Sequence, residues 1–226
     1  MPQDARIEIR GETLMLLSER AVLWEDASSL LIADTHFGKA AAFRAGGIPV
    51  PHGTTLHGIR KLDALLARTR PRRVVFLGDF LHARSGRSPA TLQHLADWRA
   101  QQHDVEMMLV RGNHDRNAGD PPRELQLECV EAPLIMPPFI LAHRPVSAPE
   151  GYVIAGHLHP GAELVGPARQ RLKLPCFWFR EEEAVLPAFG DFTGLASISP
   201  DPADRVFVVT GDAVLEVSSA AASRNE

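Results

Sequence analysis

The amino-acid sequence predicts an α/β (α+β) fold of two packed mixed β-sheets flanked by helices. Two observations lead to this prediction. In the first half of the chain, short apolar runs alternate with amphipathic stretches, and strand, helix, strand, helix, strand is the order of a parallel sheet with right-handed crossovers. From residue 139 onward the helical patterns fade, which indicates that strands dominate the second half.

The chain begins with a meander of four predicted strands, at residues 6–9, 13–17, 20–24 and 29–34. Their apolar residues either alternate with polar ones or form a continuous run, and both patterns are typical of strands. A short helical or loop segment at 38–44 follows. It ends at the Gly- and Pro-rich stretch 46–51, which predicts a break in secondary structure.

Two helices and two strands complete the first half. Leucine and isoleucine residues between positions 53 and 70 recur at three- and four-residue spacing, which predicts an amphipathic helix stopped by Pro71. A strand is predicted at 73–77 and another at 105–110. The helix between them is expected to start at Ser88-Pro89 and end near residue 102, because serine caps helices and proline suits their first position.

The second half is expected to form the second sheet. Residues 116–138 are predicted to be a surface loop around a short strand at 127–130. Further strands are predicted at 139–142, 152–156, 162–165, 170–174, 176–179, 184–187, 205–209 and 213–217, with a hairpin turn at Thr210-Gly211-Asp212. Residues 1–217 are therefore expected to form a single domain, and the small, polar residues 218–226 a disordered tail.

Composition limits the classes of function. The chain has 226 residues, of which 45% are hydrophobic and 23% charged, and this suits a globular domain. The formal net charge of −4 argues against a passive nucleic-acid-binding module, but not against an enzyme whose bound cations supply local positive charge. Two distant cysteines, no apolar leader and no apolar run of the ~20 residues that span a bilayer predict a soluble cytoplasmic protein without a membrane partner.

Five of the apolar runs end at side chains of metal-binding types. These side chains are Asp34, His36, Asp79, Asn113, His143, His157 and His159. Groups at the carboxyl ends of the strands converge in an α/β sheet, so all of them are expected to share one site. Four imidazoles favour Mn, Fe or Zn over Ca or Mg, and seven ligands are too many for one tetrahedral zinc. The set fits two divalent ions ~3.5–4 Å apart that share one carboxylate.

These motifs also resemble those of a known family. Asp34-x-His36, Gly78-Asp79, Gly112-Asn113-His114-Asp115, His143 and Gly156-His157-x-His159 resemble, in this order, the five motifs of the calcineurin-like metallophosphoesterases. The resemblance implies a four-layer αββα sandwich and a hydroxide bridging two ions as the nucleophile. One ion would be held by Asp34, His36, Asp79 and His159, and the other by Asp79, Asn113, His143 and His157. His114 would contact the phosphate and protonate or stabilise the leaving oxygen, with Asp115 orienting its ring.

A second resemblance is narrower. Residues 77–87 and 186–194 are similar to the ligase-associated DNA damage response endonucleases, which are phosphodiesterases. The resemblance implies a nuclease that acts on DNA or another phosphodiester in a repair system with a ligase, helicase or exonuclease. Manganese is the ion expected in both positions, with iron or zinc as the alternatives. The oligomeric state is left open.

Other functions and roles stay open on the sequence alone. The same metal centre would serve a phosphomonoesterase or a nucleotide pyrophosphohydrolase, and a non-catalytic scaffold of the same fold is a third alternative.

Arg84, Arg111 and Arg116 flank the motifs as candidate substrate-binding residues, because arginine binds phosphate through paired hydrogen bonds. A salt-bridged rim explains these arginines equally well. His82 either faces the cavity or lies outside it.

Overall fold

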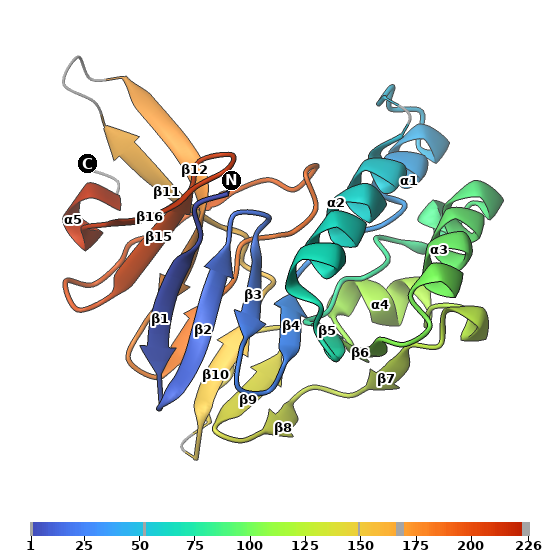
Figure 1. Ribbon diagram of the computed structural model, residues 1–226. Coiled ribbons are helices and arrows are strands. Elements are labelled where there is room, and N and C mark those ends of the chain that lie inside the picture. Colours follow the sequence, from blue (N-terminus) through green and yellow to red (C-terminus); the bar gives the residue numbers. More distant parts are fainter. Residues whose placement is uncertain (1, 52, 149, 166–169, 223–226) are drawn as a thin grey trace.

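The computed structural model describes residues 2–51, 53–148, 150–165 and 170–222 of the chain. Two β-sheets pack face to face, and the longer helices cover the outer face of the first sheet (Figure 1). This architecture confirms the predicted fold of two mixed sheets flanked by helices. Within the described ranges, no helix combines the length and the apolar character needed to cross a lipid bilayer.

The first sheet is built from the first half of the chain. Its strands are β1 (Ala5–Ile9), β2 (Glu12–Leu17), β3 (Ala21–Trp24), β4 (Ser29–Ile32), β5 (Arg73–Phe76), β6 (Glu106–Val110) and β7 (Glu128–Val130), and they lie in sequence order. The meander β1 to β4 pairs antiparallel, as predicted, and β5, β6 and β7 continue it in parallel. The carboxyl ends of β4, β5 and β6 therefore meet at one edge of the sheet.

Helices connect the parallel strands. They are α1 (Lys39–Ala45), α2 (Thr54–Thr69), α3 (Pro89–Gln101) and α4 (Asn113–Ala118), with short 3₁₀ turns at Arg84–Gly86 and Arg123–Leu125. The predicted apolar face of α2 is buried against β4 and β5, with Leu62 and Leu65 at its centre. The Ser88 side chain accepts a hydrogen bond from the Thr91 N–H over 3.2 Å, which confirms the predicted cap of α3.

The second sheet contains the remaining strands. They are β8 (Leu134–Met136), β9 (Phe139–Ala142), β10 (Tyr152–Ala155), β11 (Pro160–Val165), β12 (Arg171–Phe179), β13 (Glu183–Val185), β14 (Ala196–Ser197), β15 (Arg205–Val209) and β16 (Val214–Val217). The order is β14-β11-β12-β13-β10-β9-β8, and β15 pairs with both β12 and β16. The predicted hairpin between β15 and β16 is confirmed. Because β9 and β10 are parallel, their carboxyl ends also lie together.

The main core fills the space between the two sheets. Leu14 and Trp24 of the first sheet face Phe139 and Phe177 of the second. The rings of Trp24 and Phe139 meet edge to face with their centroids 4.8 Å apart, a favourable aromatic geometry. A second cluster lies under α2 and α3, and a small third one lies on the outer face of the second sheet. The first sheet is thus buried on both faces, which explains its continuous apolar runs.

Several elements differ from the prediction. Helix α4 precedes and enters the expected loop at 116–138, since its polar residues carry no apolar periodicity that would reveal a helix. Strand β8 also lies inside that loop, paired with β9. The two strands expected at 170–174 and 176–179 are one strand, β12. Pro175, which separates the two expected strands, lies where β12 changes its partner from β11 to β15, so its missing N–H falls at a junction of two ladders.

The predicted tail also differs in part. Ser219–Ala222 form a short helix, α5, on the outer face of the second sheet. Ala222 is buried there beside Val206 and Cys176, and this apolar contact gives the segment a reason to fold. Within the described part of the chain, α5 is the helical cover of that face. Residues 223–226 of the expected tail lie outside the described residues.

Replacing Phe177 by alanine tests the packing between the sheets. Phe177 is fully buried, so Phe177→Ala should lower the free energy of unfolding by about 3–5 kcal/mol. Leu172→Ala is the matched control in the same strand, because the Leu172 side chain is 56% exposed and should change stability by less than about 1 kcal/mol. Urea denaturation of both variants measures the difference, and equal losses would contradict the described core.

Candidate metal centre

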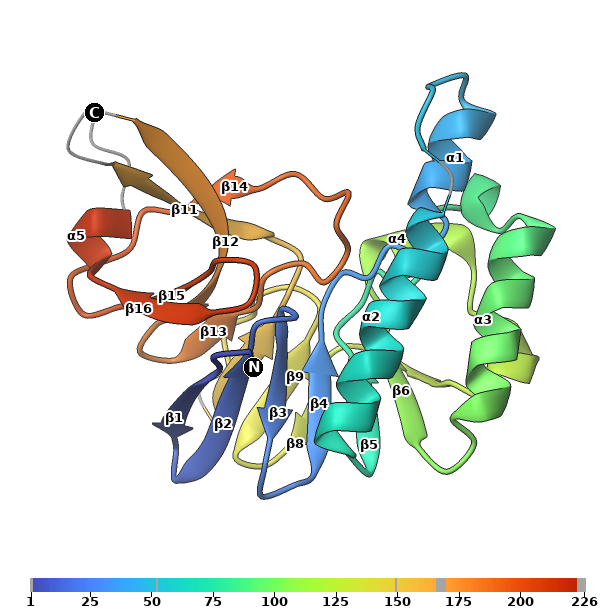
Figure 2. The ribbon, with the colours of Figure 1, turned by 45° about the horizontal axis from the view of Figure 1, so that its top comes forward.

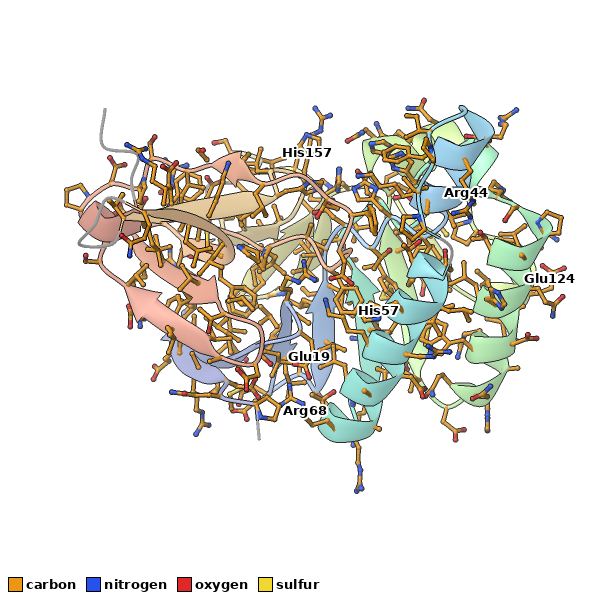
Figure 3. The ribbon with its side chains drawn as sticks, turned by 90° about the horizontal axis from the view of Figure 1, so that it is seen from above. Glu19, Arg44, His57, Arg68, Glu124 and His157 are labelled. Carbon is orange, nitrogen blue, oxygen red and sulfur yellow. The ribbon has the colours of Figure 1, made fainter. Side chains whose placement is uncertain are left out.

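The structure brings all of the predicted ligands to one place. Asp34, Asp79 and Asn113 follow β4, β5 and β6 of the first sheet, and His143 and His157 follow β9 and β10 of the second. The two sheets meet there: the His157 N–H donates a 2.8 Å hydrogen bond to Asp34 Oδ2. Figure 3 labels His157 at this junction, between the helix-covered part of the molecule and the second sheet.

A first cluster consists of Asp34, His36 and His159. One ligand atom from each lies within 4.8 Å of the others, and His159 Nε2 is 3.5 Å from Asp34 Oδ1. Asp34 Oδ1, His36 Nε2 and His159 Nε2 are all buried, and none has a hydrogen-bond partner among the described residues. Leaving such atoms unpaired costs about 1–3 kcal/mol each, whereas a divalent cation would satisfy all of them. The donor set therefore fits a metal ion.

A second cluster consists of Asp79, Asn113, His143 and His157. His143 Nε2 lies 3.0 Å from both His157 Nδ1 and Asn113 Oδ1, and 3.4 Å from Asp79 Oδ1. The other ring nitrogen, Nδ1, donates a 3.0 Å hydrogen bond to the carbonyl of Leu77. That bond fixes the tautomer and leaves the lone pair of Nε2 directed into the cluster, as expected of a metal-binding histidine.

Asp79 connects the two clusters. Its Oδ1 faces the second cluster, and its Oδ2 lies 3.9 Å from His36 Nε2 of the first. One carboxylate between two groups of metal-binding side chains is the arrangement needed to share a ligand between two ions. Burial also raises the pKa of the Asp79 carboxyl, so a nearby cation would favour its ionised form.

The backbone is strained where it delivers these side chains. Positive φ angles occur at Asp34 (55°), His36 (47°), Asp79 (52°), His157 (68°) and His159 (48°), a region that non-glycine residues rarely occupy. Such strain persists only where the surrounding structure enforces it, and it concentrates at functional sites. The turns that follow β4, β5 and β10 therefore adopt less stable backbone conformations, and these conformations direct their side chains toward the site.

Gly78 makes room for one of these ligands. A Cβ atom at this position would lie 2.3 Å from His143 Nδ1, and the φ angle of 80° is also one that favours glycine. The close approach of β5 and β9 thus depends on a residue without a side chain.

A family model described as calcineurin-like phosphoesterase matches residues 28–160, a range that contains every predicted ligand. The chain belongs to the calcineurin-like phosphoesterase family. It is accordingly a metal-dependent phosphoesterase, and its family uses a centre of two metal ions. The two clusters joined by Asp79 are the candidate ligands of such a centre.

Comparison with solved structures gives a more specific similarity. The chain is similar to the Pseudomonas putida nuclease MPE, with 42% sequence identity, a TM-score of 0.84, and coverage of 95% of this chain and 100% of that one. It also matches a phosphoesterase from E. coli, Yfce, at 16% identity and a TM-score of 0.41, covering 84% of this chain and 98% of that one. A protein of unknown function from Aquifex aeolicus, AQ665, matches at 18% identity and a TM-score of 0.38, covering 58% and 78%. Comparison with curated proteins gave no match.

His114 lies at the mouth of the centre, but Asp115 does not orient it as predicted. The His114 ring donates from Nδ1 to the backbone carbonyl of His82 over 2.5 Å and stacks on the His82 ring, with centroids 4.8 Å apart. The side chain of His114 is 35% exposed, and its Nε2 lies 3.9 Å from Asp79 Oδ2. His82 therefore lies beside the metal centre, with its Nδ1 3.3 Å from His36 Nδ1, and its carbonyl holds the His114 ring in place of Asp115.

Asp115 instead holds the loops that carry the ligands. Its buried carboxylate accepts hydrogen bonds from the backbone N–H groups of Asp79 (2.7 Å), Phe80 (2.9 Å), Leu81 (3.3 Å) and Gly112 (2.9 Å). The reason is helix α4, which was not predicted: as the third residue of that helix, Asp115 turns back toward the N-cap residue Gly112. His114 and Asp115 consequently point in different directions.

The candidate substrate-binding arginines lie in different surroundings. Arg111 forms paired hydrogen bonds of 2.7 Å with Asp120, and Arg116 contacts Glu131 at 2.7 Å, so both belong to a salt-bridged rim. Arg84 is exposed in the 3₁₀ turn before α3. Arg144 is the flanking arginine that reaches a ligand, donating to Asn113 Oδ1 over 3.2 Å. Its position directly after a ligand histidine was the available signal in the sequence.

Three histidines in or beside the site, His36, His82 and His157, are held in their neutral form. Burial lowers the pKa of His36 to about 2, and burial is also the main cause that lowers the pKa values of His82 and His157 to about 4. A neutral imidazole is the form that binds a metal ion, so these residues need not release protons at neutral pH.

The lowered pKa of His36 makes a prediction about stability. Between pH 6.5 and the folded pKa of about 2, the unfolded chain binds the proton and the folded chain does not, so stability rises with pH across this window. In the absence of metal, the wild type should therefore gain stability relative to His36→Asn as the pH rises from 4.5 to 6.5. The unfolding free energy of the wild type minus that of the variant should rise by up to about 1.4 kcal/mol per pH unit. Urea titrations in EDTA measure it, and a difference that is independent of pH would contradict the buried neutral imidazole.

Asp115→Ala tests the structural role of Asp115. The variant leaves four backbone N–H groups without their acceptor. It should lower the free energy of unfolding by at least about 3 kcal/mol and reduce the bound metal, measured by denaturation and elemental analysis. Asp104→Ala, an exposed carboxylate, is the control. If Asp115→Ala kept wild-type stability and metal content and changed only the pH profile of turnover, Asp115 would act through His114 after all.

Proposed function

We propose that the protein is a two-metal phosphodiesterase that cleaves DNA. The observation that carries the proposal is the pair of ligand clusters joined through Asp79, in a chain that is 42% identical to the P. putida nuclease over 95% of its own length. One ion would be held by Asp34, His36, Asp79 and His159, and the other by Asp79, Asn113, His143 and His157. When bound, the two ions would supply an activated water and neutralise charge on the phosphoryl oxygens.

The residues around the centre suit a phosphodiester. His114 is the partly exposed imidazole beside the shared carboxylate, and its Nε2 edge is free to meet a substrate oxygen. Because Nδ1 already donates to the His82 carbonyl, Nε2 donates a proton only in the imidazolium form. In that form His114 would bind the phosphate and protonate the leaving oxygen. We also propose Arg84 as a phosphate-binding residue, because it is exposed and follows by two residues His82, whose carbonyl and ring contact His114.

The identity of the metal and the cellular context are further parts of the proposal. Imidazole, carboxylate and amide donors suit manganese, with iron or zinc as alternatives. A nuclease of this kind would act in DNA repair, together with a ligase, helicase or exonuclease. The cysteines Cys129 and Cys176 are free thiols, and burial raises the pKa of each, which is compatible with the proposed cytoplasmic location.

Variants of His114 and Asp79 test this function. With manganese present, His114→Ala should retain its metal and fold but lose at least about 10²-fold in the turnover of single-stranded DNA, the scale of a general acid. Asp79→Ala should instead lose bound metal, because the carboxylate between the two clusters is gone. His103→Ala, an exposed histidine outside the motifs, is the control.

A substrate panel separates the alternatives. Bis-p-nitrophenyl phosphate, p-nitrophenyl phosphate, and single-stranded, nicked and duplex DNA would be compared with the wild-type enzyme. The proposal expects hydrolysis of the diester and cleavage of DNA. Faster turnover of the monoester, with no cleavage of any DNA, would assign the centre to a phosphomonoesterase.

A further inference from the structure

A cavity of about 280 Å³ lies beside the metal centre, on the side of α2. Three segments that are distant in the sequence form its wall: residues 35–39 after β4, residues 53–58 at the start of α2, and residues 189–193 between β13 and β14. Figure 2 shows the segment between β13 and β14 running from the second sheet toward α2. None of the metal-centre functions described above uses this cavity.

The cavity adjoins the metal centre directly. His36 belongs both to the first ligand cluster and to the wall of the cavity. Lys39 also lines the cavity; burial lowers the pKa of its ammonium, while the charges of Asp34 and Asp79 oppose that shift. The cavity and the metal centre are therefore neighbours, separated by the segment that follows β4.

An exposed aromatic ring stands in the cavity wall. Phe192 is 44% exposed, although a phenylalanine gains free energy by burial. The surrounding wall mixes apolar surface with hydroxyl groups, which come from Thr54, Thr55 and Thr193. Flat aromatic ligands with polar edges suit such a surface, because one face can stack on the ring while the edges form hydrogen bonds.

The loop that carries Phe192 is held in place. Gly190 donates a 3.1 Å hydrogen bond to the carbonyl of Asp34, and a Cβ atom at Gly190 would come within 2.7 Å of the Thr35 carbonyl. On the other side, Lys61 donates to the Phe189 carbonyl over 2.9 Å and lies 4.0 Å from the centre of its ring. The cavity wall is thus pre-formed, which lowers the entropic cost of binding.

A salt-bridged cluster completes this support. Asp191 pairs with Arg20 in the turn between β2 and β3 and, at 3.2 Å, with His57 of α2, the residue labelled on that helix in Figure 3. The loop is therefore tied to both the sheet and the helix that border the cavity.

We propose that this cavity binds one nucleobase of the DNA strand, next to the phosphodiester at the metal centre, with Phe192 as its stacking surface. The inference rests on the proposed nuclease function and adds a subsite to it. A net charge of −4 provides no general attraction for the backbone, so a stacking site beside the ions would supply the affinity that a basic surface gives to other nucleic-acid-binding proteins. The base must leave its stack to enter, as in other enzymes that hold an extruded base.

Abasic substitution in a single-stranded 12-mer tests the proposal. One residue at a time is replaced by an abasic deoxyribose, and cleavage by the wild-type enzyme with manganese is mapped to each phosphodiester. The proposal expects cleavage to fall selectively at a fixed position relative to the abasic residue. Phe192→Ala should raise KM on the unmodified strand by about 5- to 150-fold, the contribution of one stacked base, and should abolish the dependence on abasic position.

Two further variants keep the experiment decisive. Phe192→Trp retains a stacking surface and should restore both KM and the positional pattern. Ile135→Ala removes an exposed apolar side chain from β8, outside the cavity wall, and should behave as the wild type. Cleavage that is equally efficient at every position around the abasic residue would overturn the nucleobase site alone. The absence of any DNA cleavage by the wild type would overturn the proposed function itself.

Discussion

The crowding of two carboxylates and four imidazoles into one buried site is the constraint that governs the surrounding structure. Such groups repel, lose solvation, and leave polar atoms unpaired unless cations join them. The chain holds them together by local means: left-handed turns after the strands, a glycine where β5 approaches β9, and the Asp115 carboxylate on four backbone N–H groups. These local features destabilise the fold, and the burial of two extensive apolar clusters, one on each face of the first sheet, offsets that cost.

The predictable parts of the molecule were those encoded by neighbouring residues. Apolar runs revealed the strands, and Asp34, Asp79 and His143 followed directly from the ends of those runs, because parallel strands collect their carboxyl-terminal residues at one edge. Helix α4 was not predictable in this way, since its sequence has no apolar face. The orientation of Asp115 depends on that helix, so the sequence could single out the residue but could not predict its hydrogen-bond partners.

The cavity beside the metal centre could not be predicted either, because the segments that form its wall are far apart in the sequence. Its walls come from residues 35–39, 53–58 and 189–193, and no local pattern connects the last of these segments with the first two. Residues 186–194 drew attention only through a resemblance. The structure supplies the physical reason why that segment belongs to the site: its backbone is hydrogen-bonded to the strand end that carries Asp34. Arg111 and Arg116 show the converse, since their types suggested phosphate binding but their partners are Asp120 and Glu131.

The division of the ligands between the sheets has a consequence for maturation of the protein. Asp34, Asp79 and Asn113 come from the first sheet, whereas His143, His157 and His159 come from the second. Before the sheets dock, the first half of the chain would offer three of the four proposed ligands of one ion (Asp34, His36 and Asp79) and two of the four of the other (Asp79 and Asn113). Complete coordination of both ions would therefore require the two sheets to have docked. Ions bound by the proposed ligands would cross-link the two halves and would oppose their separation in proportion to the logarithm of the free metal concentration. Full hydrolytic activity would then be reached only by molecules whose two sheets have docked.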